Sequence, residues 1–484
     1  MTIKDLQPSV VWNNFYGLTQ IPRPSKHEGK VQEYLLAWGK AHGVEVFRDD
    51  TGNIIFRKGA TPGYENRRGV ILQGHMDMVP QKTADSGHNF LTDPISTQID
   101  GDWVTADRTT LGADNGIGVA MGLSVLEDST VAHGPVEVLV TYDEETGMTG
   151  ANSLKPGVLK GDILINLDSE EEGELCVGCA GGLDATGDFS YRSYKTPQGY
   201  EGYLLKISGL QGGHSGMDIS LYRANANRVV ARILLPLMEK YGVKVADFTG
   251  GSLRNAIPFE ATAHLLVPAD KASAVKETVQ AVFAMVKAEY IDSDPGAKMV
   301  YEKAETAPRY IQDSVMLRAV KTILVCPAGV IRMSRTMDGL TETSTNLAIV
   351  RTEKGHIRIH SLMRSAVDSS KAYLAERMRC LFELAGAEVS FAGGYSGWTP
   401  KLDTPMNKVM MAQYKKVYGK DMKIMATHGG LECAIMGAKY PNWEMVSIGP
   451  DIKYPHSPDE RVSISSVART WEYLKAVLAA VPEK

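Results

Sequence analysis

Residue types that bind divalent metal ions recur along this sequence, mostly where an apolar run ends. The set comprises His75 and Asp77 in "GHMDMVP", Asp114 in "LGADNG", Glu144 and Glu145 in "DEETG", Asp168 in "INLDSE" and His456 in "YPHSPDE". Imidazole and carboxylate ligands together suit borderline divalent ions, above all zinc, and also Mn or Co. Two histidines and three carboxylates are about what two ions need when one carboxylate bridges them.

Two such ions, roughly 3.5–4 Å apart, would lower the pKa of a water held between them and polarise a scissile carbonyl group. A further carboxylate must then accept the proton of that water. Because neighbouring residues at a strand end point in different directions, one of Glu144 and Glu145 can bind metal while the other acts as the general base. A metal-bound histidine usually donates its other ring N–H to a carboxylate, and Asp77 lies two residues from His75 on the same side of an extended strand.

Each of these residues also has a purely structural interpretation. Asp114 could cap the helix that follows it, the two glutamates could form a solvated strand end, and Asp168 could be a turn residue. The ordered set favours function, because every buried-looking strand of this region ends in a residue that can bind metal.

These side chains need elements that bring them together. From Gly69 to about Gly173, runs rich in Val, Ile and Leu alternate with helical patterns, which predicts an α/β fold with a wound, mostly parallel sheet. Open α/β sheets bind ligands at the carboxyl ends of their strands, where the polar residues of this region gather.

The sequence changes character twice. After "GCAGGLD", alternating strands and amphipathic helices predict a smaller α+β domain whose sheet is covered on one face. The Gly/Pro-rich "FAGGYSGWTP" marks a second boundary. We therefore expect a catalytic domain formed by residues 1–184 and 396–484, interrupted by an inserted lid domain of residues 185–395.

The amino-acid composition indicates which kinds of binding partner the chain can have. The chain has 484 residues, with 52 Lys and Arg against 57 Asp and Glu, so it offers no electrostatic footprint for nucleic acid or anionic membrane. It lacks the pattern of a signal peptide or a transmembrane segment, and its five cysteines do not suggest a disulfide framework. We expect a cytoplasmic protein with a small-molecule or peptide partner. The Cys176/Cys179 pair is expected to pack in a core turn.

Several motifs together resemble one family. They are "GHMDMVP", "LGADNGIGVA", "DEETGMTGA", "INLDSEEEGELCVGCAGG", "GGHSGMDI", "THGGLECAIM" and "PHSPDE". In this order they resemble the dizinc aminopeptidase/carboxypeptidase superfamily, and within it most closely the bacterial aminoacyl-histidine dipeptidases (Xaa-His dipeptidase, peptidase D). One small departure is "LECAIM", where a glycine is expected after the cysteine.

The resemblance implies a role for each matching residue of the expected catalytic domain. Glu144 would be the general base and Asp77 the partner that orients His75. The metal ligands would be His75, Asp114, Glu145, Asp168 and His456, with Asp114 bridging two ions.

The resemblance also implies roles outside the metal ligands. His214 would stabilise the developing oxyanion, Asn255 and Arg364 would hold the carboxyl end of the substrate, and Gly430 would line the pocket with its backbone. By themselves, His214 and Asn255 could be turn residues and Arg364 a surface ion-pair partner.

The function that the sequence favours is a metal-dependent dipeptidase that cleaves unblocked dipeptides, preferentially Xaa-His and including β-alanyl-histidine. A tripeptidase, aminoacylase or deacetylase of the same superfamily is the alternative, since fold does not settle substrate. A non-catalytic binding protein on the same scaffold is a more remote one. The family resemblance further implies a homodimer joined through the lid.

Overall fold

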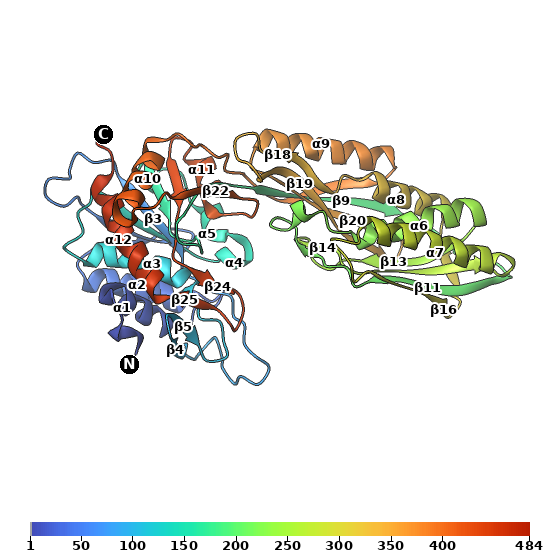
Figure 1. Ribbon diagram of the computed structural model, residues 1–484, viewed down its shortest axis with the longest axis horizontal. Helices are drawn as coiled ribbons and strands as arrows, with labels where there is room; N and C mark the ends of the chain where they lie inside the picture. The colour runs from blue at the N-terminus through green and yellow to red at the C-terminus, as the bar shows by residue number, and fades with distance from the viewer. Residues whose placement is uncertain (1) are drawn as a thin grey trace. The chain divides into compact units, whose positions relative to one another are not determined.

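The computed structural model describes residues 2–484, which divide into two compact units, both drawn in Figure 1. Unit 1 contains the residues up to Gly178 together with Trp398–Ala426 and Leu431–Lys484. Unit 2 contains Cys179–Gly397 and Thr427–Gly430. The chain thus crosses between units six residues before the expected point at Asp184 and two residues after the expected point at Tyr395. The short segment Thr427–Gly430, expected in the catalytic domain, belongs to unit 2.

The main sheet of unit 1 has eight strands and is parallel at its centre. In spatial order they are β1 (Glu45–Arg48), β2 (Ile54–Lys58), β6 (Val136–Thr141), β3 (Val70–His75), β7 (Ile163–Asn166), β23 (Glu444–Ser447), β8 (Glu174–Cys179) and β22 (Lys423–Thr427). The pairs β6–β3, β3–β7 and β7–β23 are parallel, whereas β1–β2, β2–β6 and β23–β8 are antiparallel. The expected parallel sheet is therefore its central part, with antiparallel strands toward the edges.

The central strands are rich in Val, Ile and Leu because both of their faces are covered. Every residue of β3, β6 and β7 is buried. Helix α3 (Ala113–Glu127) packs on β3 and β6 and is buried from Ala113 to Leu126, so it is a core helix without a polar face. The other helices of the unit are α1 (Ser9–Thr19), α2 (Gly29–Ala41), α4 (Glu144–Gly147), α5 (Thr149–Ser153), α10 (Pro405–Tyr418), α11 (Glu432–Lys439) and α12 (Ile464–Ala480).

A second, small sheet completes unit 1. Its antiparallel strands are, in spatial order, β24 (Ile452–Lys453), β25 (Arg461–Ser463), β5 (Trp103–Ala106) and β4 (Thr97–Asp100). His456 lies in the connection between β24 and β25. This sheet therefore carries a predicted site residue from the C-terminal part of the chain.

Unit 2 is built on one large antiparallel sheet. Its strands are, in spatial order, β16 (Lys298–Lys303), β11 (Tyr200–Ser208), β15 (Ala261–Pro268), β13 (Lys244–Gly250), β19 (Thr341–Glu353), β20 (His356–Ser365), β9 (Gly181–Ser190) and β21 (Glu388–Tyr395), and β18 (Gly329–Met333) also pairs with β19. Two short ribbons, β10 (Ser193–Lys195) with β17 (Arg309–Ile311) and β12 (Gly213–His214) with β14 (Ala256–Ile257), extend the unit.

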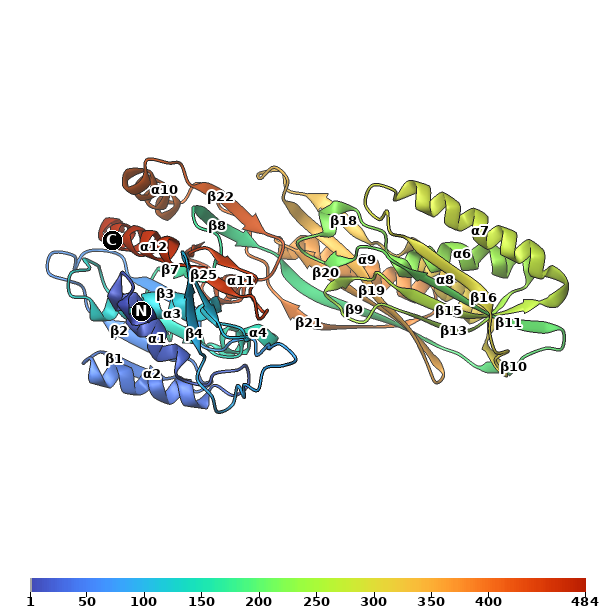
Figure 2. The ribbon, with the colours of Figure 1, turned by 60° about the horizontal axis from the view of Figure 1, so that its bottom comes forward.

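Helices cover one face of this sheet, as the alternating sequence pattern predicts. Alternate residues of β11, such as Leu205 and Ile207, are buried in one apolar core with residues of the helices. The helices are α6 (Ala226–Tyr241), α7 (Ala272–Glu289), α8 (Asp313–Val325) and α9 (Asp368–Leu384), which Figures 1 and 2 show lying along the sheet. Among residues 2–484, no helix combines the length and apolar character needed to cross a membrane.

Two local expectations were wrong. Glu144 and Glu145 do not lie at a strand end but open the short helix α4, because Asp143 adopts a left-handed conformation with φ of 51° after β6 has ended. Cys176 and Cys179 are buried, but they lie on strand β8 rather than in a turn.

Candidate metal centre

The central strands of unit 1 end level with one another at one edge of the sheet. β3 ends at His75, which pairs with Thr141 at the end of β6, and Gln73 pairs with Asn166 at the end of β7. Asp168 lies two residues beyond β7. The parallel register therefore brings His75 and Asp168 to the same edge, as expected for a ligand site in an open α/β sheet.

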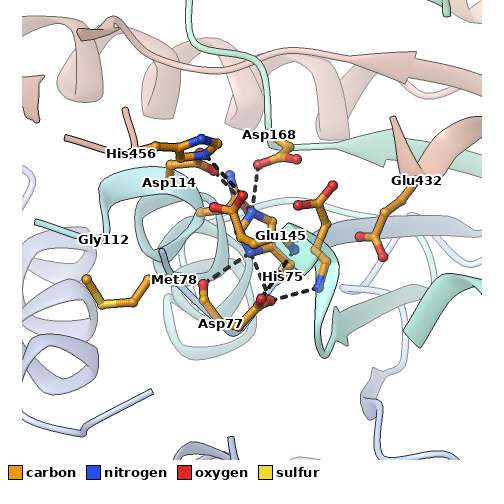
Figure 3. A network of polar contacts seen from close by, with 12 residues as sticks. His75, Asp77, Met78, Gly112, Asp114, Glu145, Asp168, Glu432 and His456 are labelled. Carbon is orange, nitrogen blue, oxygen red and sulfur yellow. Dashed lines mark hydrogen bonds and ion pairs between the residues drawn. The ribbon is translucent and has the colours of Figure 1, made fainter. Parts of the chain in front are cut away.

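Asp114 lies between two groups of these side chains, as Figure 3 shows. Its Oδ1 is 3.1 Å from Nε2 of His75, and the same nitrogen is 3.4 Å from Oδ1 of Asp168. Its Oδ2 is 3.0 Å from Nε2 of His456, and that nitrogen is 3.0 Å from Oε2 of Glu145. The five predicted ligands thus form two groups of three that share Asp114 through different oxygens.

This donor set fits two divalent cations better than it fits hydrogen bonds alone. In each group one ring nitrogen faces two carboxylate oxygens, and a single N–H cannot satisfy both. Oε1 of Glu145 and Oδ1 of Asp168 are buried without a hydrogen-bond partner among the described residues. Donor atoms of His75, Asp114 and Glu145 all lie within 4.8 Å of one another. Buried carboxylates that lack donors are costly unless a cation neutralises them.

Asp114 owes its position to an irregular start of α3. Gly112, the N-cap, has φ of 71°, and Asp114 and Asn115 have non-helical backbone angles inside the helix. The carboxylate of Asp114 accepts no backbone N–H of the helix in the described residues, and its two oxygens face His75 and His456 instead. The irregular turn leaves the Asp114 carboxylate facing both histidines.

Asp77 contacts His75 from the side opposite the other ligands. Its Oδ1 is 3.3 Å from Nδ1 of His75 and accepts the backbone N–H of Glu144 at 3.0 Å. Its Oδ2 accepts a hydrogen bond from the Ser25 hydroxyl at 2.8 Å and from the N–H of Glu145 at 3.3 Å. Both oxygens are occupied, which suits an orienting partner rather than a metal ligand.

The two glutamates of α4 differ in their surroundings. Glu145 contacts His456, whereas the Glu144 carboxylate accepts no hydrogen bond from the described residues. Burial raises the pKa of Glu144 well above its usual range. A carboxylate with a raised pKa is better matched to proton transfer near neutral pH.

His214 lies on β12 in unit 2. Its Nδ1 accepts the backbone N–H groups of Gly216 at 3.3 Å and Met217 at 3.2 Å. Burial lowers the pKa of the imidazole, and the charge of Arg364 lowers it further. The backbone donors at Nδ1 favour the tautomer with the proton on Nε2, and that nitrogen lies 3.5 Å from Nη2 of Arg364.

Arg364 of β20 is a buried guanidinium without an acidic partner. It is 5% exposed, and no carboxylate of residues 2–484 forms an ion pair with it. It contacts the Ser215 hydroxyl at 3.3 Å, the Tyr395 hydroxyl at 3.4 Å and Nε2 of His214 at 3.5 Å. Such a group suits an anionic ligand, because a buried charge otherwise pays its desolvation cost without compensation.

Asn255 and Gly430 also lie in the His214 region of unit 2. Asn255 precedes β14, whose Ala256 pairs with His214, and its carbonyl accepts the N–H of Ser215 at 2.8 Å. Gly430 lies two residues after His428, whose carbonyl oxygen would be 2.7 Å from a Cβ atom at Gly216. Unit 2 thus brings together His214, Asn255 and Arg364 with the returning segment Thr427–Gly430.

The chain matches the model of peptidase family M20/M25/M40 over residues 71–480. It belongs to this peptidase family. It is 42% identical over 482 residues to the cytosol non-specific dipeptidase of Escherichia coli (strain K12), covering 100% of this chain and 99% of that protein. The family resemblance inferred from the motifs is thus confirmed.

Solved structures agree with the fold of the peptidase. The aminoacylhistidine dipeptidase from Vibrio alginolyticus superposes with a TM-score of 0.92 at 43% identity, covering 100% of this chain and 99% of that one. The aminopeptidase PepT from Bacillus cereus, at 17% identity and a TM-score of 0.58 over 98% of this chain and 99% of that chain, shares the fold. Members of the family bind divalent metal ions, for which the groups around Asp114 supply donors.

Several buried polar residues of the peptidase were missed from the sequence. Glu28 and Asp143 lie beside Asp77, but hydrogen-bond donors already occupy this acidic group, among them the N–H of Asp143 to Glu28 and the hydroxyl of Thr146 to Asp143. Glu432, at the start of α11, accepts hydrogen bonds from Gln73 and Thr141, and burial raises its pKa to about 7. Figure 3 shows it beside the metal-binding candidates.

Their sequence signals were weak. Glu432 lies within the quoted motif "THGGLECAIM", but Glu28 stands in "PSKHEG", which has no recognisable metal-binding spacing. Their roles depend on partners that are distant in sequence.

Proposed function

We propose that this peptidase is a two-metal dipeptidase that hydrolyses unblocked dipeptides, preferentially Xaa-His, including β-alanyl-histidine. The observation that carries the proposal is the division of five donors into two groups that share the oxygens of Asp114. The printed names of the E. coli and V. alginolyticus relatives, a non-specific dipeptidase and an aminoacylhistidine dipeptidase, support the substrate class.

In this proposal, His75 and Asp168 would hold one ion and His456 and Glu145 the other, and Asp114 would serve both. Zinc is the first choice, because its ligands in proteins are histidine, carboxylate and thiolate, while Mn or Co could use the same donors. When bound, two such ions supply a more acidic water molecule and a polarised scissile carbonyl group.

Glu144 is the proposed general base. Its carboxylate would take a proton from the attacking water and return it to the amine that leaves when the peptide bond breaks. The raised pKa of Glu144 and its lack of hydrogen-bonded partners support this role. Asp77 holds His75 by its Nδ1 side and holds the start of α4 by two backbone N–H groups.

Unit 2 supplies the proposed recognition of the substrate. Arg364 would bind the free carboxylate of the C-terminal residue through its planar fork of donors, and Asn255 would bind the same end. His214 would donate its Nε2–H to the developing oxyanion, and Gly430 would line the pocket with its backbone. A requirement for a free carboxylate close to the scissile bond would restrict cleavage to the C-terminal peptide bond, which is the only peptide bond of a dipeptide.

The deciding experiment is a substrate panel on protein reconstituted with zinc, with metal counted per chain. We expect cleavage of Xaa-His dipeptides and carnosine, with little activity on N-acylated dipeptides or tripeptides. Preferential cleavage of N-acyl amino acids would instead make the protein an aminoacylase or deacetylase, and preferential cleavage of tripeptides would make it a tripeptidase. Stoichiometric metal without any hydrolysis would favour a binding protein.

Three finer points complete the proposal: zinc as the native metal, the cytoplasm as its location and a homodimer joined through unit 2. The name of the E. coli relative, a cytosol dipeptidase, supports the location. Elemental analysis of protein purified without chelators, cell fractionation and light scattering of the protein in solution test these points in turn.

A further inference from the structure

Arg23, which lies before α2, is one of the largest fully buried side chains in the molecule, at 2% exposed. Its guanidinium donates to the carbonyl oxygens of Met76 at 2.9 Å, Asp77 at 3.1 Å and Gly112 at 2.5 Å. The first two follow the candidate ligand His75, and the third precedes the candidate ligand Asp114. One side chain thus joins the two backbone segments that carry these ligands.

Glu460, also 2% exposed, holds the segment around Gly112 from its N–H side. Its Oε2 accepts the N–H groups of Leu111 at 2.8 Å and Gly112 at 2.9 Å, and its Oε1 accepts the N–H of Asp114 at 3.1 Å. Glu460 stands four residues after His456, in the connection between β24 and β25. It therefore joins the segment that carries Asp114 to the segment that carries His456.

Glycine at positions 112 and 116 leaves room for the Arg23 guanidinium. A Cβ atom at Gly112 would lie 2.6 Å from Nη2 of Arg23, and one at Gly116 would lie 2.5 Å from the same nitrogen. Gly112 also has φ of 71°, a conformation that favours glycine. Both glycines leave the space that the guanidinium occupies against the irregular start of α3.

The charges of the two residues support each other. Burial lowers the pKa of the Arg23 guanidinium, and among the neighbouring charges that of Glu460 opposes this effect most. Since both oxygens of Glu460 already accept backbone N–H groups, it is not a further metal ligand.

On the basis of the proposed metal ligands, we infer that Arg23 and Glu460 are positioning residues. They hold the 111–114 segment from its carbonyl side and its N–H side, and they fix His75, Asp114 and His456 relative to one another. Neither residue touches the substrate in this role. Residues that hold metal ligands in place typically change metal affinity 10–100-fold when they are altered.

The test measures zinc affinity by competition with a chromophoric chelator, independently of hydrolysis. Glu460→Gln replaces one accepting oxygen with an NH2 group, and Arg23→Met removes all the guanidinium donors. We expect each variant to bind zinc about 10–100-fold more weakly than the wild type. At saturating zinc, the KM for a dipeptide should stay unchanged, because no contact to substrate is lost. Arg23→Lys, which keeps the charge but not the fork of donors, should fall between wild type and Arg23→Met.

Glu137→Gln is the matched control. Glu137 of β6 is also a buried carboxylate that accepts two backbone N–H groups, from Lys160 at 2.7 Å and Gly161 at 2.9 Å, and it pairs with Arg57 at 3.0 Å. It lies near the start of β6, whereas the candidate site lies beyond the end of that strand. This control should lower the melting temperature and leave zinc affinity unchanged.

The inference is overturned if Glu460→Gln and Arg23→Met bind two zinc ions as tightly as the wild type, or if Glu137→Gln loses affinity to the same extent. If Glu460→Gln does not fold, Glu460→Asp replaces it, since a shorter carboxylate cannot span the three N–H groups. A wild-type protein that binds fewer than two ions would overturn the proposed function as well, which the wild-type titration distinguishes from a failure of the variants alone.

Discussion

Asp114 is the residue on which the two candidate metal positions depend. Its Oδ1 faces His75 and Asp168, and its Oδ2 faces His456 and Glu145. A carboxylate shared in this way is what a two-ion centre requires of a bridging ligand. Two other carboxylates of the site differ in their hydrogen bonds. The Glu144 carboxylate accepts none from the described residues, whereas both oxygens of Asp77 accept at least one.

The role of Glu144 leads to a prediction for activity. We expect Glu144→Gln to lower kcat at least 100-fold, because proton transfer by a placed base typically contributes 10²–10⁴-fold. Metal content should remain at the wild-type value, since Glu144 contacts none of the ligands by hydrogen bond. Steady-state kinetics together with elemental analysis measure both quantities. Near-normal kcat in this variant would remove Glu144 from the mechanism.

Asp77 and His75 should respond differently to substitution. His75→Ala removes a ligand and should cost about one metal ion per chain. Asp77→Asn keeps the shape but changes the hydrogen bond to Nδ1 of His75, so we expect zinc affinity to fall about 10–100-fold while both ions still bind at high zinc. Zinc titrations of the two variants compare them directly. Equal loss of metal in both would contradict the assignment of Asp77 as an orienting partner.

At the scale of elements, short irregular segments place the side chains that the regular strands and helices cannot. Asp143 has a left-handed backbone conformation and is the residue before the first turn of α4. Gly112, also left-handed, is the residue before the first turn of α3. Thr427–Gly430 is a third such segment, because it leaves unit 1 after β22 and packs in unit 2. There His428 is buried, with its Nε2 2.7 Å from the Ser344 hydroxyl.

This segment should make stability depend on pH. Burial lowers the pKa of His428 to about 3, so the folded protein holds it neutral while the unfolded chain protonates it near its ordinary value of about 6.5. Its contribution is therefore complete above about pH 6.5 and is lost as the pH falls from there toward 3, by about 1.4 kcal/mol per pH unit.

The measurement is the free energy of unfolding of wild type and His428→Gln in urea, between pH 4 and pH 8. The difference between the two proteins should shrink as the pH falls below about 6, because the variant has no imidazole to protonate. His264→Gln, at an exposed position of the same unit, is the control and should show no such trend. A constant difference across the range would show that His428 is not held neutral.

At the scale of the whole molecule, the two units have separate apolar cores. The core of unit 1 gathers the central strands, α1, α3 and α12, and the core of unit 2 gathers its large sheet and α6 to α9. All five candidate metal ligands belong to unit 1, whereas Arg364 and His214 belong to unit 2. Metal binding should therefore stabilise one unit directly.

Removal of metal tests this division. We expect a chelator to lower the unfolding temperature of unit 1 by several degrees, since zinc at 100 times its Kd contributes about 2.7 kcal/mol. The transition of unit 2 should move little. Differential scanning calorimetry with and without zinc resolves the two, and in His75→Ala the shift should be smaller. A shift confined to unit 2 would contradict the placement of the metals.

Much of the candidate site follows from the sequence alone. The apolar runs, the polar residues that follow them and their order determine the central strands, and parallel strands bring their carboxyl ends to one edge. His75, Asp114 and Asp168 are therefore recognisable as a group from their positions along the chain, and the fold class and family follow from the same motifs.

Tertiary structure alone decided the rest. Which oxygen of Asp114 faces which histidine depends on His456, more than 300 residues away, and on the irregular turn at Gly112. Likewise, Arg23 and Glu460 meet the 111–114 segment from opposite ends of the sequence, and Thr427–Gly430 joins unit 2. The physical reason is that local sequence sets the backbone propensity and periodicity of each element, whereas these contacts arise from strand order, register and packing between distant segments.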